Sequence, residues 1–327
     1  MHRISTIFSL FLLVACTLDA QTTRYAYTPI STNTIYSNWD GAGKQARDVF
    51  LPADTIAAAT DGSVYVKMRG NGRVIRIAPS GVVTEVYRIG PAAFEAGVPA
   101  LGVNLSAASI AISPDGLLYF ADRTRHRVFR VGADGTVSLV AGSGTRGYAG
   151  DAAPAAQAQL NTPQYLAIGA DQTVYFFDSG NNRIRSVDSS GTIRTVAGNG
   201  QTGEPANGAQ ALSTPMTNVF GMAVDGAGNL YVLRTASGLT GTVLWKIEKA
   251  AGTARLWAGG NANWVAITNG MQATGARLNG LTSVAVESDG TAYLAWNQGG
   301  TSASGYVNHV LKVSPAGMLS VFAARAR

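Results

Sequence analysis

The chain has 327 residues, of which only 13% are charged, and its net charge of +6 is scattered along the sequence. Because hydrophobic residues make up 46% of the chain, the composition excludes an intrinsically disordered protein. No run of five or more Lys or Arg occurs, and no arginine stripe alternates with aromatic residues, so we expect no nucleic-acid partner. The 39 glycines, with frequent Val, Ile, Thr and Tyr, favour many short strands joined by tight turns.

The first 20 residues have the pattern of a secretory signal. Arg3 supplies a positive start, and an apolar run over residues 4–15 follows it. This run is too short for a transmembrane helix and suits the core of a signal peptide. We therefore predict a signal peptide over residues 1–20 and one folded domain over residues 21–327. We expect the mature protein in the periplasm, on the cell surface or outside the cell.

Two ways of cleaving this signal are open. The four residues from Leu13 to Cys16 are Leu-Val-Ala-Cys, which resembles the lipobox of bacterial lipoproteins, where the cysteine is acylated and becomes the new N-terminus. The alternative is cleavage after Ala20, although Leu18 departs from the preference for a small residue three positions before the cut. Cys16 is the only cysteine of the chain, so no disulfide competes for its thiol. We favour lipidation at Cys16, which would give the protein its one attachment to a membrane.

Five copies of one pattern fill the rest of the chain. Each copy has an alternating apolar stretch, a glycine-bearing turn, a strand centred on tyrosine, a strand with basic residues, a second glycine turn and a last strand. The tyrosines are Tyr65, Tyr119, Tyr175, Tyr231 and Tyr293, at spacings of 54, 56, 56 and 62 residues. A sheet of such strands has two apolar faces, and it buries both by stacking radially against neighbouring sheets. The sequence therefore predicts an all-β fold, a single β-propeller of four-stranded antiparallel blades.

Copies two and three contain more specific motifs. They are Leu-Tyr-Phe-Ala-Asp at residues 118–122, Tyr-Phe-Phe-Asp at residues 175–178, and linkers that begin with Val-Ala-Gly at residues 140–142 and 196–198. These motifs resemble the NHL-repeat family, in the long-repeat, teneurin-like form found in exported bacterial proteins. The resemblance covers nearly all of residues 28–323. It implies the propeller fold but no single function, because this fold serves many roles.

The number of blades follows from the number of copies. Five visible copies predict five blades. The segment at residues 30–35 is similar to a final strand detached from its own repeat. The alternative is a six-bladed ring, which the family often forms, and it would require a degenerate further blade.

Two aspartates, Asp122 and Asp178, occupy the same position in successive repeats, and Arg127 and Arg183 follow five residues later. One hypothesis makes them part of a ring that binds a ligand. The other has each carboxylate accept backbone N–H groups in its turn and pair with the arginine. We favour the structural role, because these residues recur with the repeat.

Residues for catalysis or metal binding are scarce. His126 and His309 start the third strands of two different copies, and the remaining histidine lies in the signal segment. A three-histidine zinc site, which the resemblance implies for amidating lyases with NHL propellers, therefore lacks a ligand here. A calcium site built from oxygen ligands is open, although most acids fall in turns. There is no Gly-x-Ser-x-Gly motif for a nucleophile.

We therefore predict no catalytic, cofactor-binding or metal-binding residues. The sequence favours an exported, non-catalytic binding or scaffolding module for a protein, a peptide or a glycan. The alternative is a propeller hydrolase or lyase of the lactonase or metal-dependent type, with its site at the mouth of the central channel.

Two repeats differ from the others in one connection. Between the second and third strands, copy three has only residues 179–181, whereas copies four and five have residues 234–241 and 297–306. Both longer connections are rich in Gly, Ser and Thr, which is typical of exposed loops. They are either neutral insertions or a binding surface, and their equivalent positions put them side by side on one rim. We predict that a ligand contacts this rim near Leu239 and Trp296.

Lipidation can be tested on the mature N-terminus. Mass spectrometry should find a diacyl or triacyl group on Cys16, and Cys16→Ser should release the protein from the membrane fraction, because the acylated thiol is then missing. An unmodified N-terminus at Gln21, or a Cys16→Ser variant that stays in the membrane fraction, would contradict the prediction.

Overall fold

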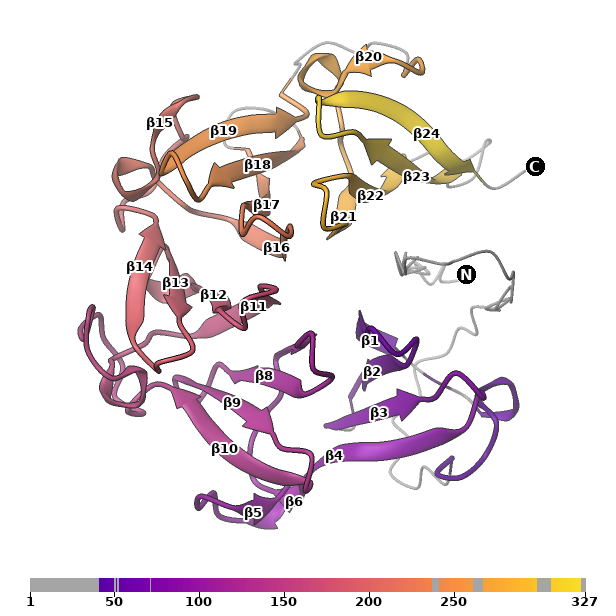
Figure 1. Ribbon diagram of the computed structural model, residues 1–327, viewed down its shortest axis with the longest axis vertical. Helices are drawn as coiled ribbons and strands as arrows, with labels where there is room; N and C mark the ends of the chain where they lie inside the picture. The colour runs from indigo at the N-terminus through magenta and orange to yellow at the C-terminus, as the bar shows by residue number, and fades with distance from the viewer. Residues whose placement is uncertain are drawn as a thin grey trace, which may run out of the picture.

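The computed structural model describes residues 41–49, 51, 53–70, 72–236, 241–260, 267–298 and 307–324. These residues form five small β-sheets arranged around a common centre, which confirms the predicted all-β propeller and its five blades (Figure 1). Among them, no helix is long and apolar enough to cross a membrane. The predicted signal peptide, Cys16 and the strand expected at residues 30–35 lie outside the described residues.

Each blade contains four consecutive antiparallel strands, as predicted, and most blades gain a short strand from a linker. Blade one consists of β1 (Ala53–Ala58), β2 (Val64–Met68), β3 (Arg73–Ile77), β4 (Val83–Ala92) and β6 (Leu101–Val103). Blade two consists of β5 (Val98–Pro99), β7 (Ser109–Ile112), β8 (Leu118–Asp122), β9 (Arg127–Val131) and β10 (Thr136–Ala141). Blade three consists of β11 (Pro163–Ile168), β12 (Val174–Asp178), β13 (Arg183–Val187) and β14 (Ile193–Ala197).

The last two blades have the same plan. Blade four consists of β15 (Ala209–Gln210), β16 (Val219–Val224), β17 (Leu230–Thr235), β18 (Thr242–Glu248) and β19 (Thr253–Ala258). Blade five consists of β20 (Met271–Gln272), β21 (Leu281–Val286), β22 (Ala292–Gln298), β23 (Val307–Val313) and β24 (Met318–Ala324). The helical turns of the described chain are the 3₁₀ segments η1 (Ala46–Asp48), η2 (Ala155–Gln157), η3 (Ser179–Asn181), η4 (Ala211–Ser213) and η5 (Ala273–Gly275).

In blades two, three and four, the second strand lies inside its sheet and has neighbouring blades on both faces. All residues of β8 and of β12 are therefore buried. This explains why these strands are nearly continuous apolar runs rather than alternating ones. The outer strands β10 and β14 alternate more, because one of their faces reaches solvent.

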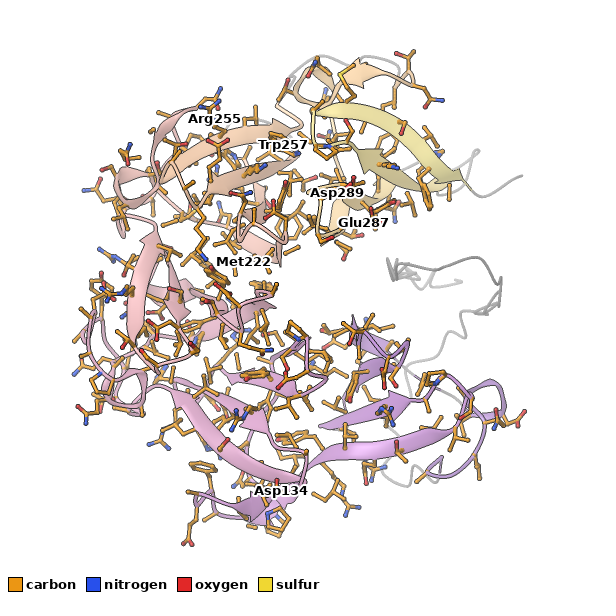
Figure 2. The ribbon with its side chains drawn as sticks, viewed as in Figure 1. Asp134, Met222, Arg255, Trp257, Glu287 and Asp289 are labelled. Carbon is orange, nitrogen blue, oxygen red and sulfur yellow. The ribbon has the colours of Figure 1, made fainter. Side chains whose placement is uncertain are left out.

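Aromatic side chains fill the space between consecutive blades. Phe120 and Phe129 stack at 5.4 Å in the core shared by blades one and two. Phe177, Met222 and Trp245 belong to the core between blades three and four, where Figure 2 labels Met222. Burial of one such side chain stabilises the fold by about 1.5–3 kcal/mol, more than the 0.5–1.5 kcal/mol of a typical hydrogen bond, so apolar packing provides most of the stability between blades.

Two of the repeat tyrosines bond their blade to the next one. The phenol of Tyr65 donates to the Gly116 carbonyl of blade two at 3.2 Å, and that of Tyr231 donates to the Gly290 carbonyl of blade five at 3.3 Å. Both carbonyls lie in the turn between the first and second strands of the following blade. A tyrosine at this point of the repeat therefore buries its ring and still satisfies its hydroxyl group.

Blade five uses its tyrosine differently. The phenol of Tyr293 donates to Glu287 of the same blade at 3.1 Å, and its ring packs on Phe322 with centroids 5.0 Å apart. Figure 2 labels Glu287 in blade five, on the side of the ring that faces blade one. Through the described residues, blades five and one do not pack as consecutive blades do (Figure 1).

The glycine of the Val-Ala-Gly linker motif is required because the linker backbone passes very close to the backbone at the start of the third strand. Gly198 has φ +97°, and a Cβ atom there would press against the carbonyl oxygen of Asn182 and lie 2.8 Å from Arg183 Cα. Gly142 approaches His126 in the same way after blade two. The motif recurs because the linker crosses the start of the third strand without room for a side chain.

Two glycine-to-alanine variants should separate the free-energy cost of the steric clash from the cost of the left-handed backbone conformation. Gly191 has φ +81° with open space around its Cβ position, so Gly191→Ala should cost about 1–2 kcal/mol in the free energy of unfolding. Gly198→Ala should cost roughly 1–3 kcal/mol more, because its methyl group has no space. Denaturant unfolding of both variants measures the difference. Equal losses would show that the linker can move away.

Candidate ligand-binding site

A pocket of about 350 Å³ lies where blades three and four meet, at the rim that carries the connections between second and third strands. Its walls come from the start of β11, the end of β12, the turn after it, the linker and the start of β16. Phe177 and Val219 supply the apolar part of the lining. The pocket is within the size range of small-molecule sites.

The polar lining consists of amides and hydroxyl groups. The amides belong to Gln164, Asn182 and Asn218. The hydroxyl groups belong to Ser179, Thr202 and Thr217, and the backbone of the linker at residue 203 completes the wall. None of these lining side chains is ionisable, and every amide or hydroxyl can both donate and accept a hydrogen bond.

One repeat position at this pocket changes from histidine to asparagine. Between blades two and three, His126 Nδ1 accepts a hydrogen bond from the backbone N–H of Thr162 at 3.1 Å. At the next junction Asn182 and Asn218 occupy the equivalent positions, with φ values of 51° and 56° against 55° for His126 and 53° for Thr162. Asn182 is shorter, and its amide turns to the linker carbonyl of Gly200 at 3.4 Å. The space that the imidazole fills at one junction is left open at the next.

A buried arginine holds the blade-four wall and the linker in place. Arg234 is fully buried and forms an ion pair with Glu204 at 2.6 Å. Its guanidinium also donates to the carbonyls of Thr217 at 3.1 Å and Gly203 at 3.2 Å. The planar fork of arginine reaches these acceptors at once, which fixes two sides of the pocket before any ligand arrives.

A buried carboxylate fixes the blade-three wall. Asp178 accepts the Asn161 backbone N–H at 2.6 Å and the Asn181 side-chain amide at 2.6 Å. Arg185, also fully buried, lies 3.5 Å from Asp178 and 2.8 Å from Asp151 of the linker. Desolvation by burial raises the pKa of Asp178 to about 6 from its ordinary value of 3.8, although the hydrogen bonds and Arg185 act in the opposite direction.

The structure confirms a structural role for both aspartates, which end β8 and β12, but only Asp122 accepts backbone N–H groups of its own turn, and the predicted arginine partners are wrong. Asp122 accepts the backbone N–H of Thr124 at 3.0 Å and pairs with Arg125 at 2.9 Å rather than Arg127. Asp178 pairs with Arg185 rather than Arg183. The predicted arginines extend along the sheet to linker carbonyls, Arg127 to Ser143 at 2.7 Å and Arg183 to Asn199 at 2.9 Å.

The two histidines of the folded domain lie in different blades. His126 bonds to Thr162 as described above, and the His309 ring lies on Trp296 with centroids 5.4 Å apart. Within the described part of the chain, no group of three or more His, Cys, Asp or Glu is placed to hold a metal ion. The expected lack of metal-binding residues stays a prediction, with the calcium alternative open.

Of the two predicted ligand contacts, only Trp296 lies among the described residues. Leu239 is outside the described residues, but its connection begins beside the pocket, where the Thr235 N–H donates to the Asn218 carbonyl at 3.1 Å. Trp296 lies in β22 with 6% of its surface exposed, and its indole donates to the Asn279 carbonyl. A ligand near Leu239 and Trp296 stays a prediction.

The sequence indicated this rim but missed the pocket residues. The available signal was the change from His126 to Asn182 at one repeat position, which alignment of copies two and three exposes. That signal names a position without showing that a cavity forms there.

The geometry defines a β-propeller of the NHL type whose described blades carry a neutral polar pocket at one inter-blade junction. Residues 35–207, more than half of the chain, match the family model described as the teneurin NHL domain. The chain belongs to this family, which confirms the resemblance inferred from its repeats.

Related proteins agree with this assignment. Teneurin-m of Drosophila melanogaster is 32% identical over 179 residues, which cover 49% of this chain and 6% of that protein. The chain thus spans only a small part of the length of this relative.

Solved structures share the fold. A protein of unknown function from Bacteroides thetaiotaomicron has a TM-score of 0.53 and 18% identity, over 75% of this chain and 56% of that chain. A gluconolactonase from Xanthomonas campestris has a TM-score of 0.51 and 14% identity, over 86% of this chain and 76% of that chain. At these identities the likeness concerns the fold alone.

The raised pKa of Asp178 predicts a specific dependence of stability on pH. Between about pH 4 and 6 the folded state keeps a proton on Asp178 that the unfolded chain has lost, so raising the pH lowers the free energy of unfolding. The loss should total on the order of 3 kcal/mol relative to Asp178→Asn. Urea unfolding of both proteins from pH 4 to 8 measures it.

Asp188→Asn is the matched control, because the Ser190 hydroxyl bond lowers the pKa of Asp188. Its carboxylate should stabilise the fold above pH 4 and lose that effect as the pH falls, which is the opposite sign. A flat difference between wild type and Asp178→Asn would contradict a raised pKa at Asp178.

Proposed function

We propose that this chain is an exported, non-catalytic binding module that takes up its ligand, a protein, a peptide or a glycan, at the rim of blades three to five. The observation that carries the proposal is the pocket between blades three and four. Its lining offers hydrogen-bonding groups without ionisable side chains, and buried arginine and aspartate residues hold its walls. This arrangement suits recognition better than acid–base or nucleophilic chemistry.

The long connection of blade four extends this site. It leaves β17 at Thr235, which bonds to the pocket wall at Asn218. A ligand that fills the pocket and continues along the rim would meet this connection and then that of blade five. The predicted contacts near Leu239 and Trp296 thus form the second half of one proposed surface. Export by the N-terminal signal and anchoring through Cys16 would present this surface outside the cytoplasm.

Membership of the teneurin NHL family supports a binding role rather than a particular reaction. The alternative, a lactonase-like or metal-dependent hydrolase or lyase, draws on the fold shared with the gluconolactonase. A fold alone does not transfer an activity, because catalysis depends on the site that the fold carries.

Shortening the two long connections tests the proposed surface. The structure places Arg234, Thr235, Asn297 and Gln298 in β17 and β22, so the connections to shorten are residues 236–241 and 299–306. Cut to the length of Ser179–Asn181, they should leave the melting temperature nearly unchanged, because loop closure contributes little to stability. Binding to immobilised glycan and peptide arrays should be lost. Asp134→Asn, in a turn of blade two away from this rim (Figure 2), is the control and should bind like wild type. Binding that survives the double shortening would show that the connections are neutral insertions.

Enzymatic activity has its own test. Wild-type protein, with and without added Ca²⁺ or Zn²⁺, should not accelerate hydrolysis of glucono-1,5-lactone. Turnover that purifies with the protein would replace the binding proposal with the lactonase alternative.

A further inference from the structure

We infer that the pocket between blades three and four recognises an uncharged carbohydrate, one or two sugar units at a time. The inference rests on the proposed binding function and specifies its ligand. It follows from the groups that line the pocket, from how the pocket arises in the repeat, and from which backbone groups are absent from its walls.

The lining matches the chemistry of a sugar. A sugar hydroxyl both donates and accepts, and so do the Gln164 and Asn218 amides and the Thr202 hydroxyl group. Phe177 and Val219 are buried, at 3% and 5% exposed, and close the floor of the pocket without offering a broad face to a sugar ring. The volume of about 350 Å³ is small for a folded partner and adequate for a short saccharide.

Charge excludes acidic or basic ligands from this pocket. The nearest ionic groups are already engaged: Arg234 pairs with Glu204, and Arg185 pairs with Asp151 and Asp178. Arg183, next to Asn182, donates to the carbonyls of Asn181 and Asn199. A carboxylated or sulfated sugar would bring a charge into a lining that offers no counter-charge, and desolvating that charge is costly. The pocket should therefore distinguish neutral sugars from acidic ones.

A peptide fits this pocket less well. Extended peptides bind by adding a strand to an open sheet edge, where a row of backbone N–H and C=O groups is free. The pocket instead collects side chains from strand ends, a turn and a linker, so its walls supply no such row. Hydrogen bonds to separate hydroxyl groups are what these walls can provide.

The repeat itself supplies the variant that closes the pocket. His126 has almost the same φ as Asn182, 55° against 51°, and fills the preceding junction by bonding to Thr162. In Asn182→His, the imidazole should fill the pocket in the same way, with Asn218 as the new backbone donor. The variant should fold normally, because the protein already contains this arrangement one blade earlier.

The experiment uses the full chain and defined probes. Saturation-transfer NMR and calorimetry measure binding of maltose, cellobiose, lactose, methyl mannoside and N,N′-diacetylchitobiose, with glucuronic acid and sialyllactose as acidic counterparts and capped tripeptides as the peptide class. We expect at least one neutral sugar to bind, the acidic sugars to bind at least tenfold more weakly, and Asn182→His to weaken binding at least tenfold with an unchanged melting temperature. Thr202→Val, at an exposed lining position, should weaken the same sugar several-fold.

The outcomes separate the two proposals. Binding of tripeptides but not sugars, lost in Asn182→His, would overturn the carbohydrate inference and leave the binding module intact. Preference for acidic sugars would also overturn it. Sugar binding that Asn182→His does not change would place the sugar elsewhere and refute this pocket. If no probe class binds to wild type, the carbohydrate inference is refuted. The pocket then no longer supports the proposed binding function.

Discussion

The structure depends on one constraint: each blade is a thin sheet with two apolar faces, and neither face can be buried within the blade. Each blade must therefore pack against its neighbours, and the aromatic cores between blades provide most of the stabilising free energy. The repeat tyrosines are part of this constraint, since Tyr65 and Tyr231 bury their rings between blades and donate to the following blade. This packing fixes the distances between blades, and the linkers, turns and buried ion pairs span those distances.

The linkers turn this packing into a rigid rim. The linkers after blades two and three each cross the start of a third strand at a glycine, as Gly198 does at Asn182, and then supply an acid to a buried arginine of the next blade. Asp151 does this for Arg185, and Glu204 does it for Arg234. Each junction has its own set of these contacts. A substitution in one copy of the repeat therefore changes one junction and leaves the contacts of the next one in place. The pocket between blades three and four is such a local change, and the proposed site therefore adds little strain to the propeller.

The sequence predicted much of the fold and the role of some polar residues, but fewer of their partners. The period of the tyrosines was enough for five blades, and recurrence of Asp122 and Asp178 was enough to assign them a structural role at the ends of β8 and β12. Their arginine partners were wrong, because the two copies use different residues: Asp122 pairs with Arg125, which Asn181 replaces in copy three, and Asp178 pairs with Arg185. Arg127 and Arg183 extend to linker carbonyls, while Arg185 reaches Asp178 from two residues further along the same strand.

The sequence by itself determined the architecture of the described blades, since alternating apolar strands, glycine turns and a long repeat leave radial stacking as the way to bury both faces of every sheet. It also determined the rim at which the repeats diverge. Only the tertiary structure decided that Asn182 and Asn218 face each other across a cavity, and that Arg234 holds its walls. These residues lie far apart in the chain, and the space between their side chains depends on how closely two blades pack, which no local pattern records.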